Sequence, residues 1–307
     1  MIAASGTTYR LAETSAFIFP PSATRVYQRG NSLSIPVRLT GCLSLGYYGF
    51  MEELTAERIR EGLATKFMGQ KIVYFESIGS TNDVAKESVD EGAPEGTLVI
   101  AEEQTAGKGR LGRPWIAPPG TSLLFSLLLY PDLTLEHVPR LTMLASLAAA
   151  EAIESVTGLP VRFKWPNDIL IRGRKSGGVL TEVGVTGERL DYVVVGIGLN
   201  VNWNPSQVPE LVEKATSLSE ELGREVSRLE LLQRLLIYME RGYLRLQEGY
   251  FPHKVFTWHL ANIGEKVKVV LPRGKEEGFV EGVDADGALL LRREDGSTVR
   301  VTMGEVA

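Results

Sequence analysis

The sequence predicts an α+β fold that ends in a small β-barrel. Residues 161–199 contain four strand-like segments joined by short turns, which indicates a mostly antiparallel meander. A strong helical pattern, rich in Ala and Leu, precedes them at 139–157. After Trp258 the pattern changes to short alternating segments, which is typical of a small barrel. A chain of 307 residues has room for about two such domains.

The composition is that of an ordinary folded protein. Hydrophobic residues make up 44% and charged residues 23% of the chain, which excludes a wholly disordered or collagen-like protein. No apolar run reaches the ~20 residues that a membrane helix needs. One cysteine, Cys42, excludes an internal disulfide framework and a Cys-rich zinc site. Three histidines without HExxH spacing argue against a His-built metal centre, and the net charge of −5 argues against a globally basic nucleic-acid binder.

Residues 1–50 differ from the rest of the chain. They are rich in Ser and Thr, and Glu13 is their only acid against four arginines. No sustained helical or strand period occurs in them. The segment fits an organelle transit peptide, a disordered tail, or upstream sequence translated from the wrong start, since Met51 opens a better ordered pattern.

From Met51 onward, capped helices alternate with short apolar strands. Thr55 and Ser80 are of the residue types that begin helices. Residues 104–120, rich in Gly, Pro and basic side chains, predict a loop. The other elements expected in this part are helices at 56–61 and from 80 to about 90, and strands at 72–75, 96–101 and 122–130.

In the second half, Gly158 and Pro160 end the helix at 139–157. A long helical stretch is expected at about 206–249, broken near Gly223. The expected strands are 161–165, 169–171, 178–183, 192–199, 265–271, 277–283, 288–292 and 298–301.

Residues 107–112 match the GxGxxG pattern of dinucleotide-binding folds. That interpretation fails, because Pro114 and two further prolines exclude the helix that must hold the pyrophosphate. A P-loop fails too, since a glycine follows Lys108. What remains is a glycine-rich loop whose Lys108, Arg110 and Arg113 suit phosphates and carboxylates. A flexible surface loop with solvated charges is the alternative.

Three further motifs belong to the strand region. Residues 164–168, Lys-Trp-Pro-Asn-Asp, suit a nucleotide and its metal, although an Asx-turn explains the last two equally well. Residues 173–178 predict a basic hairpin turn. Residues 196–202 place glycines in a buried strand, which indicates a close backbone approach or a packing constraint. No nucleophilic triad is evident.

In this order the motifs resemble those of the biotin protein ligases. The match rests on Ser80-Thr81-Asn82, Gln104 with GKGRLGRPW, KWPNDIL, Lys175 and GIGLNVN, and it extends from Met51 to the C-terminus. The resemblance implies a catalytic domain at 51–260, similar to class II aminoacyl-tRNA synthetases, and an SH3-like barrel at 261–307. Residues 1–50 would be a disordered extension. Because they lack two amphipathic helices around a tight turn, the chain resembles the ligase-only class, without the DNA-binding domain.

The resemblance also implies the site residues. A hydroxyl–hydroxyl–amide cluster matches the ureido head of biotin. The implied biotin site is Ser80, Thr81, Asn82, Gln104, Gly109, Arg110, Leu111 and Lys175. The implied ATP site is Arg113, Trp115, Lys164, Asn167, Asp168 and Asn200. Arg110, Lys175 and Asp168 carry the implied catalytic roles. Lys108 stands where family loops usually have arginine, so its role is open. No protein cage for a metal is expected, and Mg²⁺ would arrive with the ATP phosphates.

The implied reaction has two steps. Biotin and ATP give biotinyl-5′-AMP and pyrophosphate, and a lysine of a biotin carboxyl carrier protein then takes the biotin and releases AMP. The expected partner is that carrier protein, with neither DNA nor membrane, and the enzyme would be a cytoplasmic monomer or homodimer. Three alternatives remain open: a lipoate or octanoate ligase, a biotin-responsive transcription regulator, and a pseudo-enzyme that only binds biotin.

Overall fold

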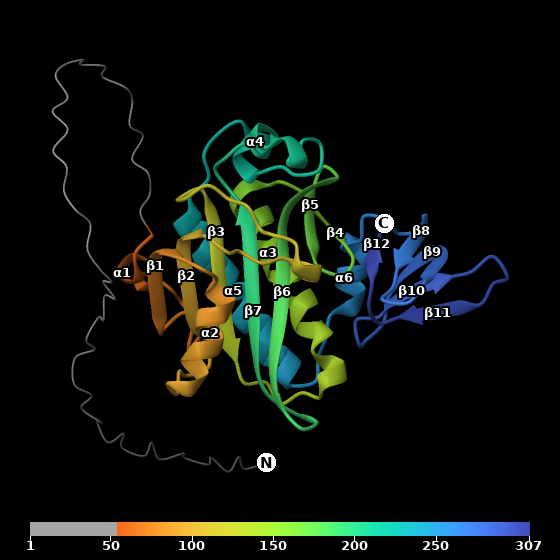
Figure 1. The fold of residues 1–307 in the computed structure, drawn as a ribbon, viewed down its shortest axis with the longest axis horizontal. Helices are drawn as coiled ribbons and strands as arrows, with labels where there is room; N and C mark the ends of the chain where they lie inside the picture. The colour runs from red at the N-terminus through yellow and green to blue at the C-terminus, as the bar shows by residue number, and fades with distance from the viewer. Residues whose placement is uncertain (1–53) are drawn as a thin grey trace, which may run out of the picture. The chain divides into compact units, whose positions relative to one another are not determined.

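The computed structural model describes residues 54–307, so the expectations for residues 1–50 lie outside the described part of the chain. The described residues form a seven-stranded mixed sheet with helices on both faces, followed by a five-stranded antiparallel sheet (Figure 1). The expected α+β fold with a small C-terminal β domain is therefore confirmed.

The large sheet has the strand order β1-β2-β3-β7-β6-β5-β4. Only β1 and β2 pair in parallel, and each other neighbouring pair is antiparallel. The predicted meander is thus confirmed, since short turns can join only antiparallel neighbours. The strands are β1 (Ile72–Ile78), β2 (Thr97–Gln104), β3 (Ser122–Leu129), β4 (Val161–Lys164), β5 (Asp168–Ile171), β6 (Arg174–Thr186) and β7 (Arg189–Asn200).

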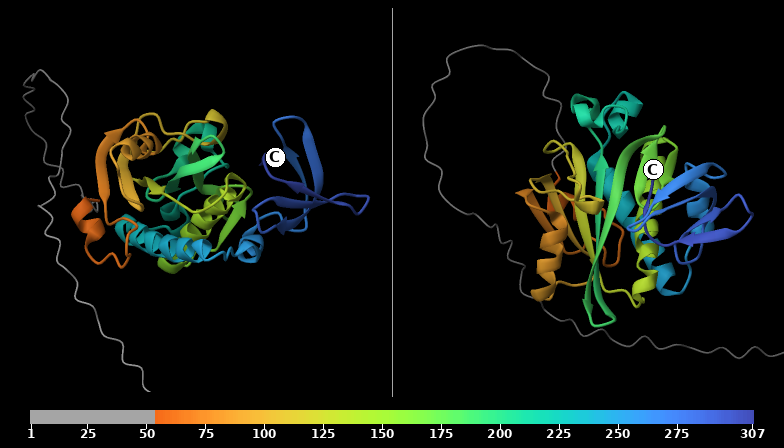
Figure 2. Two further views of the ribbon diagram at one scale, coloured as in Figure 1. Left: turned by 90° about the horizontal axis from the view of Figure 1, so that it is seen from below. Right: turned by 45° about the vertical axis from the view of Figure 1, so that its right-hand side comes forward.

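The helices cover the two faces of this sheet differently. Helices α3 and α5 pack against each other on one face, while α2 packs on β2, β3 and β7 on the other (Figure 2). Of the helices in residues 54–307, none is long and apolar enough to cross a membrane. The helices are α1 (Ala56–Arg60), α2 (Thr81–Asp90), α3 (Pro139–Thr157), α4 (Leu218–Leu222), α5 (Arg228–Gln247) and α6 (His253–His259).

Helix α3 supplies much of the core because its sequence is apolar on nearly every side. Eleven of its residues are buried, including Leu141, Ala145 and Ile153. It ends at Gly158, whose φ of 73° is the left-handed conformation that glycine adopts without strain. The predicted bounds, 139–157, are confirmed.

Two sequence-based expectations were wrong. Residues 206–217 are not helical, because Pro205 and Pro209 each start only a short 3₁₀ turn, η3 (Pro205–Gln207) and η4 (Pro209–Leu211). Strand β6 begins at Arg174, so Lys175 lies in a strand and not in a hairpin turn. The predicted break at Gly223 does separate α4 from α5.

The C-terminal sheet has the order β11-β10-β9-β8-β12 and packs against the main body through α6. Phe163 of β4 stacks on Phe256 of α6 with ring centroids 4.7 Å apart, and Trp165 Nε1 donates to the Gly287 carbonyl at 3.2 Å. The last strand, β12, was not predicted, because two residues carry no period. The strands are β8 (Lys266–Val270), β9 (Lys275–Val283), β10 (Leu289–Arg292), β11 (Thr298–Val301) and β12 (Glu305–Val306).

Candidate active site

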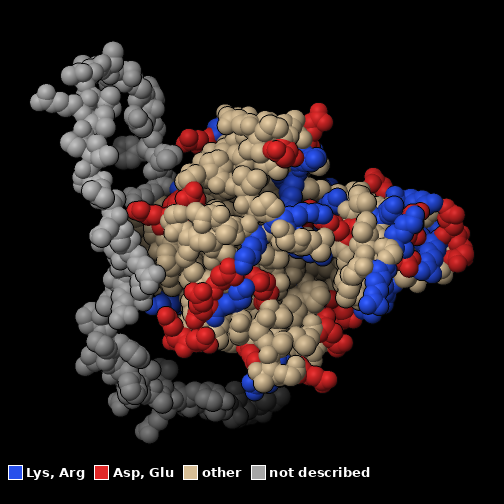
Figure 3. Space-filling view, in the orientation of Figure 1, with Lys and Arg blue, Asp and Glu red and all other residues tan. Residues whose placement is uncertain are grey.

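A cavity of about 130 Å³ lies between the N-terminal end of α2, the segment 105–121 and strands β6 and β7. Figure 1 shows this segment crossing in front of β7 and β6, and Figure 3 shows Lys and Arg side chains across the centre of the same face. Most of the residues expected in the site line this cavity. They are Ser80, Thr81, Asn82, Gln104, Gly109, Arg110, Arg113, Trp115, Asn167, Asp168 and Lys175.

Three expected residues do not line the cavity. The side chain of Leu111 is 74% exposed, and its φ of 57° turns the loop. Lys164 ends strand β4 and is only half-buried. Asn200 is buried at the end of β7, where its Nδ2 donates to the Thr216 carbonyl at 3.0 Å.

One end of the cavity is a cluster of neutral hydrogen-bonding groups. The backbone N–H and hydroxyl of Thr81 both point at Gln104 Oε1, at 2.8 and 3.1 Å. Ser126 Oγ lies 2.8 Å from Thr81 Oγ1 and 2.6 Å from Asn82 Oδ1. Ser80 occupies the N-cap position of α2, yet its hydroxyl makes no capping hydrogen bond. A fixed set of donors and acceptors therefore faces the cavity.

The side chain of Asn82 is fixed by a carboxylate of strand β6, Glu182. Its Nδ2 donates to Glu182 Oε2 at 2.7 Å, and Lys86 pairs with the other oxygen of that carboxylate at 3.0 Å. This support fixes which way the amide points, because only the NH₂ group can donate to a carboxylate. Sequence reasoning missed Ser126 and Glu182, since single polar residues inside strands carry no local pattern.

Glycines of β7 form the floor of the cavity. A Cβ on Gly196 would lie 2.1 Å from Asn82 Oδ1, and a Cβ on Gly198 would lie 2.7 Å from the Trp115 ring. Both distances are too short for any side chain. Both interpretations of these glycines therefore meet here: side chains pack closely against the backbone of β7, and they belong to two expected site residues.

The basic loop is folded and not simply solvated. Gly109 N–H donates to the Arg113 carbonyl at 2.7 Å, and Trp115 N–H donates to the Gly107 carbonyl at 2.9 Å. Lys108 Nζ lies 2.6 Å from Asp83 Oδ2, and this bond holds the pKa of the Asp83 carboxyl below its ordinary value. The loop is thereby tied to helix α2, beside the neutral cluster.

The two arginines of the loop reach the end of the chain. Arg110 donates to the Gly304 carbonyl at 3.1 Å, and burial lowers the pKa of its guanidinium. Arg113 makes a forked ion pair with both oxygens of Glu305, at 2.6 and 2.7 Å, which lowers the pKa of that carboxyl. Glu305 also lines the cavity. Sequence reasoning missed it because 192 residues separate it from Arg113.

Lys175 and Asp168 form the charged wall opposite the loop. Lys175 Nζ lies 2.5 Å from Asp168 Oδ1 and 5.8 Å from the centre of the Trp115 ring. The backbone of Lys175 exchanges hydrogen bonds with Lys214 and Thr216, both at 2.9 Å. A strand position anchored on both sides aims the ammonium more firmly than the predicted turn would.

Several buried polar atoms have no hydrogen-bond partner in the described part of the chain. Near this wall they include Trp115 Nε1, Ser176 Oγ and Asn200 Oδ1. Such atoms are rare in folded proteins and commonly meet a ligand or water. Within residues 54–307, no group of three or more His, Cys, Asp or Glu side chains could hold a metal ion.

Two family models match this chain, one in the part with the large sheet and one in the part with the C-terminal sheet. Residues 74–200 match the biotin/lipoate A/B protein ligase family, and residues 263–307 match the biotin protein ligase C-terminal domain. The first match contains the cavity's motifs, and the second ends with the strand that carries Glu305.

Individual relatives point the same way. The chain is 40% identical to the bifunctional ligase/repressor BirA of Bacillus subtilis over 247 residues, 80% of this chain and 76% of that relative. It is 33% identical to the biotin–[acetyl-CoA-carboxylase] ligase of Mycobacterium tuberculosis over 237 residues, 74% of this chain and 85% of that relative. The Aquifex aeolicus biotin protein ligase in complex with biotin and ATP superposes with a TM-score of 0.68 at 32% identity, covering 78% of this chain and 98% of that one.

Proposed function

Because this chain belongs to the biotin protein ligases, within the biotin/lipoate A/B protein ligase family, we propose that it activates biotin with ATP and transfers it to a lysine of a biotin carboxyl carrier protein. One observation carries this proposal. A single cavity is lined at one end by neutral donors and acceptors and at the other by cations beside a carboxylate. The first end suits a cyclic urea, and the second suits a carboxylate that meets a phosphate.

The biotin head is assigned to the neutral end. Ser80, Thr81 and Asn82 can donate to and accept from the ureido group, and Gln104 holds Thr81 in place. This cluster favours biotin over lipoate or octanoate, because a ureido group can hydrogen-bond with these side chains and a fatty chain cannot. Gly109 and the backbone of Leu111 belong to the loop that covers this end.

The adenylate is assigned to the charged end. Arg110 and Lys175 would contact the biotin carboxylate and the α-phosphate, while Arg113, Lys164, Asn167 and Asp168 serve ATP. Trp115 Nε1, which is unpartnered within the described residues, favours a polar ligand such as the nucleoside on this side, and Asn200 is proposed to support it from the end of β7.

The oxygens of Asp168 and Asn167 are of the kind that Mg²⁺ prefers, so the wall fits an ion held mainly by the ATP phosphates. When bound, such an ion would neutralise part of the phosphate charge.

The chemistry then needs no protein nucleophile. A biotin carboxylate oxygen attacks the α-phosphorus, the bond to the pyrophosphate oxygen breaks, and biotinyl-AMP remains. The acceptor amine next attacks the acyl carbon, and AMP leaves with the electrons of the broken carbon–oxygen bond. Fixed Arg and Lys groups stabilise the charge that moves onto the phosphate oxygens without having to reorganise. The closed loop keeps water from the mixed anhydride.

The organisation of the chain follows from this function. We propose a catalytic domain at 51–260, a C-terminal domain at 261–307, and an extension at 1–50 without a DNA-reading role, since its sequence has no helix-turn-helix pattern. The enzyme would act in the cytoplasm on its carrier protein, as a monomer or homodimer.

The direct test combines the protein with biotin, ATP, Mg²⁺ and a biotin carboxyl carrier domain. We expect a biotin-dependent gain in mass on one lysine of the carrier and stoichiometric release of AMP. Lipoate or octanoate in place of biotin should give no product, and a gel shift with biotin-operator DNA should be negative. Equal use of lipoate would contradict the substrate assignment, and a specific DNA shift would contradict the ligase-only proposal.

A further inference from the structure

A second cavity, of about 240 Å³, adjoins the first. Arg110, Asn167, Val179 and Leu180 line both. The second cavity extends from these shared residues to the C-terminal part of the structure, where Gly287, Thr302 and Met303, which connect its strands, line it. A ligand in this second cavity would therefore reach the charged end of the first.

We propose that the second cavity is the entrance through which the lysine side chain of the acceptor protein reaches the active site. The proposal rests on the proposed ligase function, which requires a lysine amine to meet the acyl carbon of biotinyl-AMP. That carbon lies, by our assignment, where Arg110 and Asn167 separate the two cavities.

The lining has the chemistry that such a side chain needs. Pro139, Met143, Trp165 and Met303 give apolar walls suited to the four methylenes of lysine. No carboxylate is among the lining residues, and Arg110, at the inner end, is the one charged side chain. Apolar walls and a neighbouring cation both favour the neutral amine over the ammonium, and only the neutral amine is a nucleophile.

The other substrates fit this cavity poorly. A triphosphate needs several cations, and one arginine lines the cavity. The indole N–H of Trp165 is already engaged by the Gly287 carbonyl, whereas the unpartnered Trp115 Nε1 belongs to the first cavity. The ureido head of biotin has its hydrogen-bonding groups in the first cavity as well.

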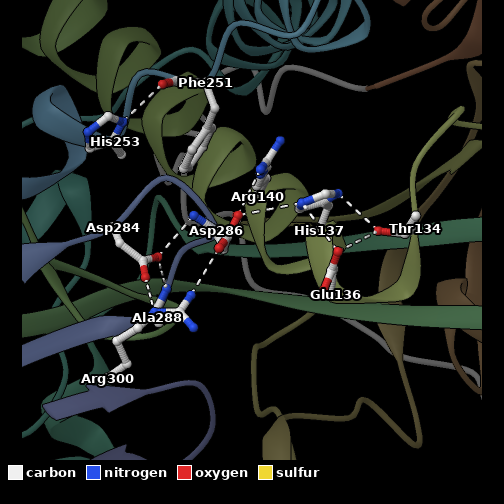
Figure 4. A network of polar contacts seen from close by, with 10 residues as sticks. All are labelled: Thr134, Glu136, His137, Arg140, Phe251, His253, Asp284, Asp286, Ala288 and Arg300. Carbon is white, nitrogen blue, oxygen red and sulfur yellow. Dashed lines mark hydrogen bonds and ion pairs between the residues drawn. The ribbon is translucent and has the colours of Figure 1, made fainter.

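Charged residues adjacent to the cavity lining join the two parts of the structure beside the second cavity. Asp286 accepts from Arg140 at 2.8 Å and from Arg300 at 2.9 Å, and His137 lies 3.5 Å from the same carboxylate (Figure 4). Asp284 Oδ1 accepts two backbone N–H groups at 2.9 Å and so shapes the turn that carries Gly287. The two rims, at the start of α3 and in this turn, are thus fixed to each other before any acceptor arrives.

The transfer step is balanced in this arrangement. The amine nitrogen forms a bond to the acyl carbon, while the bond from that carbon to the phosphate oxygen breaks and leaves its electron pair on AMP. The surplus proton of the amine passes to the phosphate of the leaving AMP, which is the base nearest to the new bond.

Met303 provides the test, because its side chain is 59% exposed and lines the second cavity and not the first. At this exposed position the acceptor lysine is still an ammonium, in contrast to the inner end beside Arg110. Met303→Lys places a like charge there, so kcat/KM for the carrier domain should fall about tenfold or more. Biotin-dependent exchange of pyrophosphate into ATP, measured without acceptor, should not change. Capture of biotinyl-AMP by hydroxylamine, which is too small to need the apolar walls, should also persist.

Two variants act as controls. Ile263→Lys adds the same charge at a 45% exposed apolar residue that lines neither cavity, and it should transfer at the parent rate. Met303→Leu keeps an apolar wall and should transfer far faster than Met303→Lys. Transfer by Met303→Lys at the parent rate, or a loss of pyrophosphate exchange instead of transfer, would overturn the proposed entrance. Failure of the unsubstituted protein to form biotinyl-AMP would overturn the proposed function, and the entrance with it.

Discussion

Lys175 and Asp168 form an ion pair across the charged end of the cavity, with 2.5 Å between Nζ and Oδ1. A cation beside two mutually repelling anions, the biotin carboxylate and the α-phosphate, matters most as charge shifts onto the phosphate oxygens. Lys175→Ala should slow adenylation by about a hundredfold or more, while biotin affinity falls less. Transfer from supplied biotinyl-AMP should be less impaired, because its carboxylate is already activated. Single-turnover measurements separate the two steps.

Lys175→Arg is the matched variant for this prediction. It keeps the charge but replaces a point charge by a planar fork, so adenylation should recover only in part. Normal adenylation by the alanine variant, or a defect confined to transfer, would refute this role for Lys175.

Gly196 and Gly198 offer a paired test of which end of the cavity binds which substrate. A Cβ on Gly196 would collide with Asn82, and a Cβ on Gly198 would collide with Trp115. Gly196→Ala should therefore raise the dissociation constant of biotin about tenfold, the effect of losing roughly one buried hydrogen bond, and leave ATP binding nearly unchanged. Gly198→Ala should do the reverse.

Calorimetric titration of each glycine variant with biotin alone and with ATP alone measures both effects. The two substitutions are chemically identical and lie two residues apart on β7, so each is the control for the other. The same affinity change in both variants would contradict the assignment of the two ends.

At the level of elements, the basic loop is closed against β12 by the ion pair of Arg113 with Glu305. Arg113 is 63% exposed, so the pair contributes about 1 kcal/mol at most. Glu305→Gln should therefore speed dissociation of biotinyl-AMP by about three- to fivefold. Glu281→Gln removes another carboxylate of the C-terminal sheet, paired with Arg292 away from the cavity, and should have no effect. Chase of bound biotinyl-AMP measures the rate.

The same ion pair gives a pH dependence with a definite sign. The pKa of Glu305 lies below its ordinary value of 4.5, chiefly through its bonds with Arg113. Loop closure should therefore be fully present above pH 4.5 and be lost as the pH falls through the lowered pKa. Tryptophan fluorescence, to which Trp115 of this loop contributes, should show this transition in the parent protein. Glu305→Gln is the control and should lack it. An identical acid transition in both would show that another group controls the loop.

The sequence predicted those elements whose pattern is local, and it missed residues whose partners are distant in the chain. Helix α3 and the strands of the meander follow local patterns of apolar residues and lie where they were expected, although β6 and β7 extend beyond their predicted ends. The motifs around Asn82, Arg110 and Asp168 are each contiguous, and it was their resemblance to the biotin protein ligases that placed them in one site, as the cavity lining now does. Glu305 could not, since its role depends on a partner 192 residues away. Residues 206–217 misled because a polar, charged stretch resembles a helix until its prolines are weighed.

Across the whole of residues 54–307, the two sheets share one core. One continuous cluster of buried hydrophobic side chains includes both Leu54 in the catalytic part and Val306 in the last strand. Phe256 of α6, fully buried between the two sheets, stacks on Phe163. The C-terminal sheet is therefore part of the folding unit and supplies Gly304 and Glu305 to the closed loop.

Deleting residues 1–50 should leave stability and activity unchanged, whereas deleting residues 261–307 should destabilise the fold. The first segment has no periodic apolar pattern and so little surface to add to a core. A chain that starts at Met51 should have the same melting temperature and the same rate of biotin transfer as the full chain, within experimental error.

The C-terminal part should behave differently. A chain that ends at Leu260 should unfold at a much lower temperature, because it exposes buried residues that the C-terminal sheet covers, such as Trp165 and Phe256. Differential scanning calorimetry and the carrier biotinylation assay measure both. A tenfold loss of rate, or a drop of many degrees, after removal of residues 1–50 would show that this segment contributes to the fold or the site.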